Sequence, residues 1–317
     1  MPVSKKGIDV RRNKAVIAAF IAPAVLIFCV VFVYPILRTV YMSFFQVENA
    51  TSSISQWVFV GTKNFTDLAR IELFKISLWN LFRIWAIGGA GVLTLGLLFA
   101  IILNSGIRFR KFFRAAIYMP NVISAVALAT MWIQYVYNPK FGLATKAWLG
   151  VANFLESIGL GPFGKINWTD SDHKFWSLLI AYCFGMVGYH MLIFSGGIEK
   201  IPVELYEAAT IDGASRPQQF FKVTYPLLKG VIRTNITMWS ITSVGFFVWS
   251  QLFAMVTADT QTITPMVYMY LQVFGAGNVV TERNAGLGAA VGVVLSLIVV
   301  AVFILTTAIV REEEIEF

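Results

Sequence analysis

Long apolar runs dominate the sequence and limit the folds that are open to it. A helix needs about 18 or more mostly apolar residues to cross a bilayer, and runs of that length recur along the 317 residues. They lie at about 15–37, 78–103, 115–137, 175–198, 231–257 and 285–310. Only 13% of the residues are charged, whereas a soluble domain carries about 25%. We therefore predict an all-α integral membrane protein with six transmembrane helices and polar loops between them.

The basic residues predict the orientation of these helices. Of the 25 Lys and Arg residues, five precede the first run, four lie at 108–114, five at 200–233 and one at 311. Cytoplasmic loops are enriched in Lys and Arg, so this distribution places both termini in the cytoplasm. Because the basic residues cluster at membrane edges, the net charge of +8 does not indicate a nucleic-acid partner.

The ionisable and reactive residues narrow the function classes. All 17 acidic residues lie outside the six runs, which disfavours an ion-coupled secondary transporter, although ion sites in broken helices keep that alternative open. Neither the two cysteines nor the two histidines show a metal, disulfide or catalytic spacing, so we predict no enzyme activity. The segment 159–165 resembles a phosphate loop, but it lacks the following Ser or Thr that such a loop needs.

One charged stretch, residues 199–230, separates the fourth run from the fifth. Pro202 fits the first position of a helix, and Gly213 fits a left-handed helix end. Ser215, with a glutamine three residues later, predicts a capping box that starts a second helix, which Pro226 is expected to close. The stretch therefore predicts two short helices joined by a sharp turn, protruding from the bundle into the cytoplasm.

The same stretch resembles a known motif. Glu207-Ala208-Ala209, Asp212-Gly213-Ala214 and Val223-Thr224-Tyr225-Pro226 are similar to the EAA loop of ABC-importer permeases, with Tyr225 where that family prefers leucine. The resemblance implies a type I, MetI-like permease bundle in which this loop docks on an ATPase subunit. The residues that it assigns to this coupling are Glu207, Ala208, Ala209, Asp212, Gly213, Ala214 and Pro226.

Two other segments, 59–65 and 113–142, resemble the maltose-type sugar permeases of bacteria. The resemblance implies a single permease domain over residues 1–317, with the core bundle at 75–310, in the bacterial cytoplasmic membrane. The implied partners are a second, homologous permease, two ATP-binding-cassette ATPases, an external solute-binding protein and membrane lipid. ATP and Mg would be bound by the ATPases, and no cofactor by this chain. An oligosaccharide is the expected solute, with glycerol-3-phosphate or another small polar solute as the alternative.

Polar and aromatic residues within two runs are candidates for the solute path, since aromatic faces stack on sugar rings and hydroxyls or amides bond to them. The candidates are Tyr182, Tyr189 and His190 in the fourth run and Trp239, Ser240, Ser243, Phe247 and Gln251 in the fifth, where the last four have helical spacing. The alternative is that these side chains only pack within the bundle. In the second run, glycines at 88, 89, 91 and 96 predict close helix packing.

Overall fold

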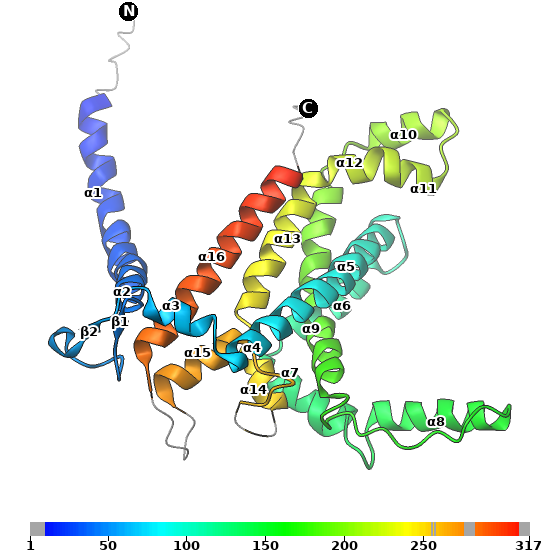
Figure 1. Ribbon diagram of the computed structural model, residues 1–317. Helices are drawn as coiled ribbons and strands as arrows, with labels where there is room; N and C mark the ends of the chain where they lie inside the picture. Colours follow the sequence, from blue (N-terminus) through cyan, green and yellow to red (C-terminus); the bar gives the residue numbers. More distant parts are fainter. Residues whose placement is uncertain (1–9, 255, 257, 276–282, 311–317) are drawn as a thin grey trace, which may run out of the picture.

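The computed structural model describes residues 10–254, 256, 258–275 and 283–310. The chain within these ranges is almost entirely helical, as predicted, and Figure 1 shows a central bundle from which α1, α8 and a helical hairpin extend. The first half contains α1 (Val10–Phe28), η1 (Cys29–Val33), α2 (Tyr34–Met42), β1 (Phe45–Gln46), η2 (Ile54–Gln56), β2 (Val58–Phe59), α3 (Lys63–Leu68), α4 (Glu72–Arg83), η3 (Ile84–Gly88), α5 (Gly89–Asn104), α6 (Arg110–Val122), α7 (Ala125–Met131), η4 (Trp132–Val136) and α8 (Leu143–Ser157). The second half contains α9 (Lys174–Ile198), α10 (Val203–Ile211), α11 (Arg216–Gln219), η5 (Phe220–Thr224), α12 (Tyr225–Leu227), α13 (Lys229–Val244), α14 (Val248–Phe253), α15 (Pro265–Phe274) and α16 (Ala285–Ile309).

Among the described residues, four continuous helices are long and apolar enough to cross a membrane: Val16–Met42, Glu72–Asn104, Lys174–Ile198 and Ala285–Ile309. They coincide with the first, second, fourth and sixth predicted runs. The first lies largely outside the bundle, since none of its apolar window is buried within the chain, and only its α2 part packs on α16. These four helices confirm the prediction of a multi-pass membrane protein.

The third predicted span is bent and is not one straight helix. Arg110–Val122 and Ala125–Val136 meet at 98°, because Ile123 and Ser124 between them are extended. Together the two pieces are long and apolar enough for a fifth span. The prediction of a single helix over 115–137 is therefore wrong, since the apolar composition of the run is the same whether the helix is straight or bent.

The fifth predicted span is broken as well. α13 ends at Val244, residues 245–247 are not helical, and α14 covers only 248–253. The break leaves backbone carbonyls unpaired inside the helix, and a buried carbonyl needs a donor. The hydroxyl of Thr264 donates to the carbonyl oxygen of Phe246 at 2.6 Å, which stabilises the break. The expectation of one helix over 231–257 is thus wrong, and residues 255 and 257 of that range lie outside the described residues.

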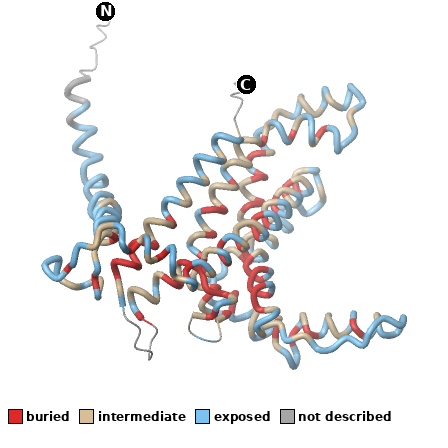
Figure 2. The backbone as a smooth tube through the Cα atoms, in the orientation of Figure 1, coloured by how far each residue is buried: buried red, intermediate tan, exposed pale blue. Residues whose placement is uncertain are grey.

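Two predicted loops contain helices. α8 occupies the segment after the third span, and α15 occupies the segment between the fifth and sixth spans. The segment after the first span holds a short antiparallel ladder in which Phe45 pairs with Phe59. Figure 2 shows the buried residues concentrated in α9, α14 and the start of α16, whereas α1, α8 and the helical hairpin are mostly exposed.

The glycines of the second span let α5 and η3 approach their neighbours closely. A Cβ on Gly89 would lie 2.5 Å from Nε1 of Trp239, and a Cβ on Gly96 would lie 3.2 Å from the backbone nitrogen of Met191. Gly91 has no heavy atom within 4 Å of such a Cβ. A Cβ on Gly88 would lie 3.0 Å from Cζ2 of Trp239. The predicted packing role is therefore confirmed for Gly88, Gly89 and Gly96, whereas Gly91 makes no such contact with the described part of the chain.

Candidate functional site

The stretch 199–230 forms a helical hairpin that protrudes from one end of the bundle (Figure 1). Its first arm is α10 and its second arm is the series α11, η5 and α12. Pro202 does not occupy the first helical position as predicted. It is the N-cap, with an extended backbone, and the helix begins at Val203. The observed position differs from the predicted one by a single residue. The physical reason for a proline at either position is the same, because its nitrogen has no proton that a helix start would leave unpaired.

The turn of the hairpin is a Schellman motif centred on Gly213. Its φ is +78°, in the left-handed region that glycine adopts without strain. The N–H of Gly213 donates to the carbonyl of Thr210 at 3.0 Å, and that of Ala214 donates to the carbonyl of Ala209 at 2.9 Å. The predicted role of Gly213 as the helix end is confirmed, and alanines 209 and 214 close the same motif.

The second arm begins with the predicted capping box, in which Gln218 accepts a hydrogen bond from the backbone of Ser215 at 2.7 Å. Pro226 does not close this arm. The chain remains helical through Leu227, because a wide π turn at Phe220–Thr224 precedes the proline and Pro226 stands near the start of α12. Pro226 stands in the first turn of α12, where a helix tolerates proline because the missing N–H would have no helical partner there.

Polar contacts hold the two arms together. The hydroxyl groups of Tyr206 and Thr224 lie 2.9 Å apart, and the side-chain amide of Gln219 donates to the hydroxyl of Thr210 at 3.0 Å. Gln219 and Thr224 are buried, whereas most other residues of the hairpin are exposed or half-buried. Of the four residues that make these contacts, only Thr224 belongs to the sequence motif. These contacts fix the relative position of the two arms, so the hairpin is preformed. The residues that make them are brought together only by the fold.

The tip of the hairpin presents a mixed acidic and apolar surface. Glu207, Ala208 and Asp212 are exposed, and the side chain of Ile211 is 87% exposed. Ile211 therefore adds an apolar side chain to the acidic residues of the tip. Sequence reasoning missed Ile211, although its position directly before Asp212 and Gly213 places it at the turn.

The base of the hairpin is tied to a neighbouring helix. Nη2 of Arg114, in α6, lies 2.6 Å from Oε1 of Glu199, which caps the end of α9. The two side chains are 32% and 50% exposed, so the pair is screened by solvent. Its geometry connects the bent third span to the point where the hairpin leaves the bundle.

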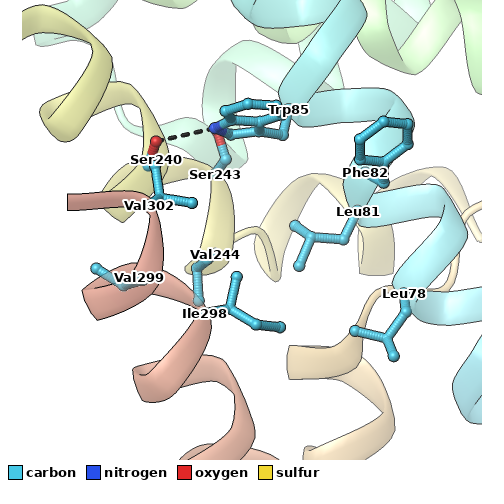
Figure 3. A pocket seen from close by; sticks show the side chains of 10 residues that line it. All are labelled: Leu78, Leu81, Phe82, Trp85, Ser240, Ser243, Val244, Ile298, Val299 and Val302. Atoms are coloured by element: carbon cyan, nitrogen blue, oxygen red, sulfur yellow. Dashed lines mark hydrogen bonds between the residues drawn. The ribbon is translucent and has the colours of Figure 1, made fainter. Parts of the chain in front are cut away.

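A cavity of about 330 Å³ lies within the bundle among α4, η3, α13 and α16 (Figure 3). Its lining residues are Leu78, Leu81, Phe82, Trp85, Ser240, Ser243, Val244, Ile298, Val299 and Val302. Trp85 Nε1 donates to Oγ of Ser240 at 2.8 Å, and Oγ of Ser243 donates to the carbonyl of Trp239 at 2.6 Å. The cavity wall is therefore apolar apart from two hydroxyls and one indole N–H, which are hydrogen-bonded. Sequence reasoning missed Trp85.

Three of the other path candidates belong to the packed core. Tyr182 is buried, with its ring centroid 5.7 Å from Trp239 and 4.6 Å from Phe246. Trp239 is 1% exposed and donates to the carbonyl of Trp85. His190 is fully buried, and its Nδ1 lies 2.8 Å from Oδ1 of Asn235. In this chain these side chains face protein and do not line the cavity.

The helical spacing expected from Ser240 to Gln251 does not exist in the structure. It requires one continuous helix, and the break at 245–247 separates Ser240 and Ser243 on α13 from Gln251 on α14. Phe247 is half-buried against Tyr270, at 5.2 Å between ring centroids. Gln251 and Tyr189 are also half-buried, and neither lines the cavity. Only the two serines are brought together at one wall.

Comparison with known proteins agrees with this architecture. Residues 92–313 match the family described as "Binding-protein-dependent transport system inner membrane component". The arabinooligosaccharides transport system permease protein AraP of Bacillus subtilis (strain 168) is 29% identical over 93% of this chain and 88% of its own length. The diacetylchitobiose uptake system permease protein NgcF of Streptomyces coelicolor is 29% identical over 76% of this chain and 67% of its own length.

A solved structure shows the same fold. A chain of a bacterial ABC transporter involved in the import of the acidic polysaccharide alginate superposes with a TM-score of 0.74 and 18% identity, covering 97% of this chain and 98% of that one. The match extends over the bundle, the bent third span and the hairpin. With its several apolar helices, its protruding hairpin and a match over most of its length, the chain belongs to the family of binding-protein-dependent transport system inner membrane components.

Proposed function

We propose that this chain is the permease subunit of an ATP-driven importer and forms half of the path for a sugar, in the first place an oligosaccharide, delivered by an external solute-binding protein. The sugar class is supported by the relatives, which are named as permeases for arabinooligosaccharides and diacetylchitobiose. The observation that carries the importer class is the preformed hairpin with its exposed Glu207, Ile211 and Asp212.

In this proposal the hairpin couples the bundle to one of two ATPase subunits, which bind ATP and Mg. Ile211 enters an apolar groove of the ATPase, and the carboxylates at its sides fix the orientation. A nucleotide can shift the permease between two conformations only if the ATPase contacts them differently. The hairpin tip provides such a contact, because it is exposed and rigidly built. A second, homologous permease completes the assembly.

The proposed topology has six spans with both termini in the cytoplasm. Four spans are the continuous helices, the third is the bent α6–α7–η4 unit and the fifth is α13 with α14. The hairpin and the basic cluster at 108–114 then lie on the cytoplasmic side, where Lys and Arg are enriched. The whole of residues 1–317 forms one permease domain in the cytoplasmic membrane.

The solute path is proposed to run along the wall that carries Ser240 and Ser243, with the opposite wall supplied by the second permease. None of the residues that line this cavity is charged, which favours a neutral sugar over glycerol-3-phosphate. Trp85 contributes a flat aromatic face beside Ser240, and such a face suits a sugar ring.

The proposal is tested by purifying the tagged chain from its host in mild detergent and identifying the proteins that accompany it. Gly213→Val forces a β-branched residue into a left-handed backbone, and Glu207→Lys reverses a tip charge, so both should lose the ATPase. Gly159→Val is the matched control, because Gly159 also has a left-handed φ, of +84°, with open space around it, but lies far from the hairpin.

Recovery of an ATPase with the wild-type chain and with Gly159→Val, but not with the two hairpin variants, is the expected result. Equal recovery from all four chains would contradict the assigned role of the hairpin. A single chain that transports solute without any ATPase would overturn the importer class and favour a secondary transporter.

A further inference from the structure

α8 carries an apolar stripe that no other part of the described chain covers. Its members are Leu143, Ala147, Val151 and Phe154, followed by Ile158 at the C-cap, and this spacing places them on one face of the helix. Leu143, Val151, Phe154 and Ile158 are 68%, 50%, 63% and 56% exposed. An unbroken exposed apolar face of this length marks an interaction surface.

The opposite edge of α8 is already packed. Thr145 and Ala152 are buried, and Nε1 of Trp148 donates to the carbonyl of Gly164 at 3.0 Å in the segment that returns to α9. The backbone N–H of Phe163 donates to Glu156 at 2.9 Å in the same segment. α8 therefore has its intramolecular partner on one edge, and the stripe is a second, separate face.

A tight turn fixes α8 to the end of the third span. The side chain of Asn138 accepts from the backbone N–H of Lys140 at 2.9 Å, and the carbonyl of Asn138 accepts from the hydroxyl of Thr145 at 3.0 Å. A Cβ on Gly142 would lie 2.5 Å from two carbonyl oxygens, so the turn cannot open around a larger residue. Figure 1 shows the axis of α8 lying across the direction of α9, at the end of the bundle opposite the hairpin.

We infer that α8 is an interfacial helix that lies on the surface of the membrane, on the outer leaflet in the topology proposed above, with its stripe inserted among anionic lipids. The exposed apolar surface of the span continues into the stripe through Tyr135 and Phe141, which are 65% and 52% exposed. The segment 138–168 contains three lysines and one glutamate, and all three lysines are exposed. A helix with an apolar face and basic flanks, held across the spans at their end, has the geometry of a helix in the headgroup region.

The composition of the stripe argues against a soluble partner as its main occupant. A transient protein–protein interface is about as apolar as the rest of a protein's surface, with polar groups interspersed. The stripe of α8 contains only Leu, Ala, Val, Phe and Ile. The inference rests on the membrane-spanning bundle and does not depend on the solute that the importer carries.

The test places single cysteines on α8 in the full chain, within the complex as purified from its host. Val151→Cys and Phe154→Cys probe the stripe, and Asn153→Cys, exposed but off the stripe, is the matched control. The background carries Cys29→Ser and Cys183→Ala. Each cysteine is labelled with bimane in nanodiscs of phosphatidylcholine and phosphatidylglycerol, and the unsubstituted complex gives the labelling background. Quenching is measured with headgroup-proximal doxyl lipid and with aqueous iodide.

Doxyl lipid is expected to quench the labels at 151 and 154 about threefold more than the label at 153, with iodide showing the reverse order. Iodide quenching at 151 and 154 equal to that at 153 would place the stripe in water and overturn the inference. Protection from both quenchers would show that protein covers the stripe, and this result would also overturn the inference.

A charge test separates anionic lipid from lipid in general. Lys140→Glu with Lys146→Glu is expected to lower doxyl quenching at 151 in discs that contain phosphatidylglycerol, but not in discs of phosphatidylcholine alone. Both lysines are exposed, so the change should leave the packing of the helix intact. An equal effect in the two kinds of disc, or none in either, would refute the anionic-lipid part of the inference.

Discussion

Replacing Gly89 by alanine tests how closely the second span and α13 are packed. The new Cβ would lie 2.5 Å from Nε1 and 2.9 Å from Cδ1 of Trp239, which is 1% exposed. Trp239 cannot move aside without lengthening its 2.8 Å hydrogen bond to the carbonyl of Trp85. Overpacking costs roughly 1–3 kcal/mol and an unmade buried hydrogen bond about 1–3 kcal/mol, while alanine recovers up to about 1 kcal/mol of helix propensity. We expect a net destabilisation of about 2–4 kcal/mol.

The assay is the thermal midpoint of the detergent-solubilised chain, followed by size-exclusion chromatography with fluorescence detection. Gly91→Ala is the matched control, because no heavy atom lies within 4 Å of its Cβ, and it should be neutral or slightly stabilising. In a Trp239→Phe background the cost of Gly89→Ala should fall, since the smaller ring removes the clashing nitrogen. Equal midpoints for the two alanine variants would refute the packing argument.

Three further outcomes are expected. Lys174 and Asp259 form a buried ion pair, so Lys174→Met should destabilise the chain by about 3–5 kcal/mol, and adding Asp259→Leu should recover much of that loss in the midpoint. Arg114→Glu should change stability by less than about 1 kcal/mol but lower solute-stimulated ATP hydrolysis by the complex, and Glu199→Arg in the same chain should restore it. The hydrogen bond from the side chain of His173 lowers the pKa of Asp170, so this carboxylate stabilises the start of α9 at neutral pH. That contribution should fade as pH falls below about 4, and Asp170→Asn should reduce the pH dependence of the midpoint in that window.

The hairpin could be predicted from sequence because its signals are local. A left-handed position such as Gly213 and a capping box such as that of Ser215 depend only on residues a few positions apart. The same is true of the apolar runs, whose length alone indicates a membrane. Two predictions within the hairpin were wrong: Pro202 by one residue, and Pro226, because the π turn before it has no sequence signal of its own.

The breaks in the third and fifth spans could not be predicted, because an apolar run looks the same whether its helix continues or stops. The break after Val244 depends on Thr264, which reaches the carbonyl of Phe246 from 18 residues away. That contact exists only once the chain has folded back on itself. The helical spacing from Ser240 to Gln251 was wrong for the same reason, since it presupposed one helix where α13 ends between them.

The hairpin joins α9 to α13, and α13 also carries part of the cavity wall, so this helix gives the proposed coupling a physical route. A Cβ on Gly197, at the end of α9, would lie 2.6 Å from a methyl of Val231 and 2.9 Å from one of Leu228, so α9 and α13 are in close contact where the hairpin begins. A packed interior responds to a push by moving as a body and not by compressing. A displacement of Ile211 by an ATPase would therefore move α13 from its base, and α13 carries Ser240 on the cavity wall. The break after Val244 can act as the end of the moving segment, because the helix is already interrupted there. The carbonyl of Phe246 in the break already accepts a hydrogen bond from Thr264, so no helical bond has to be broken at that point.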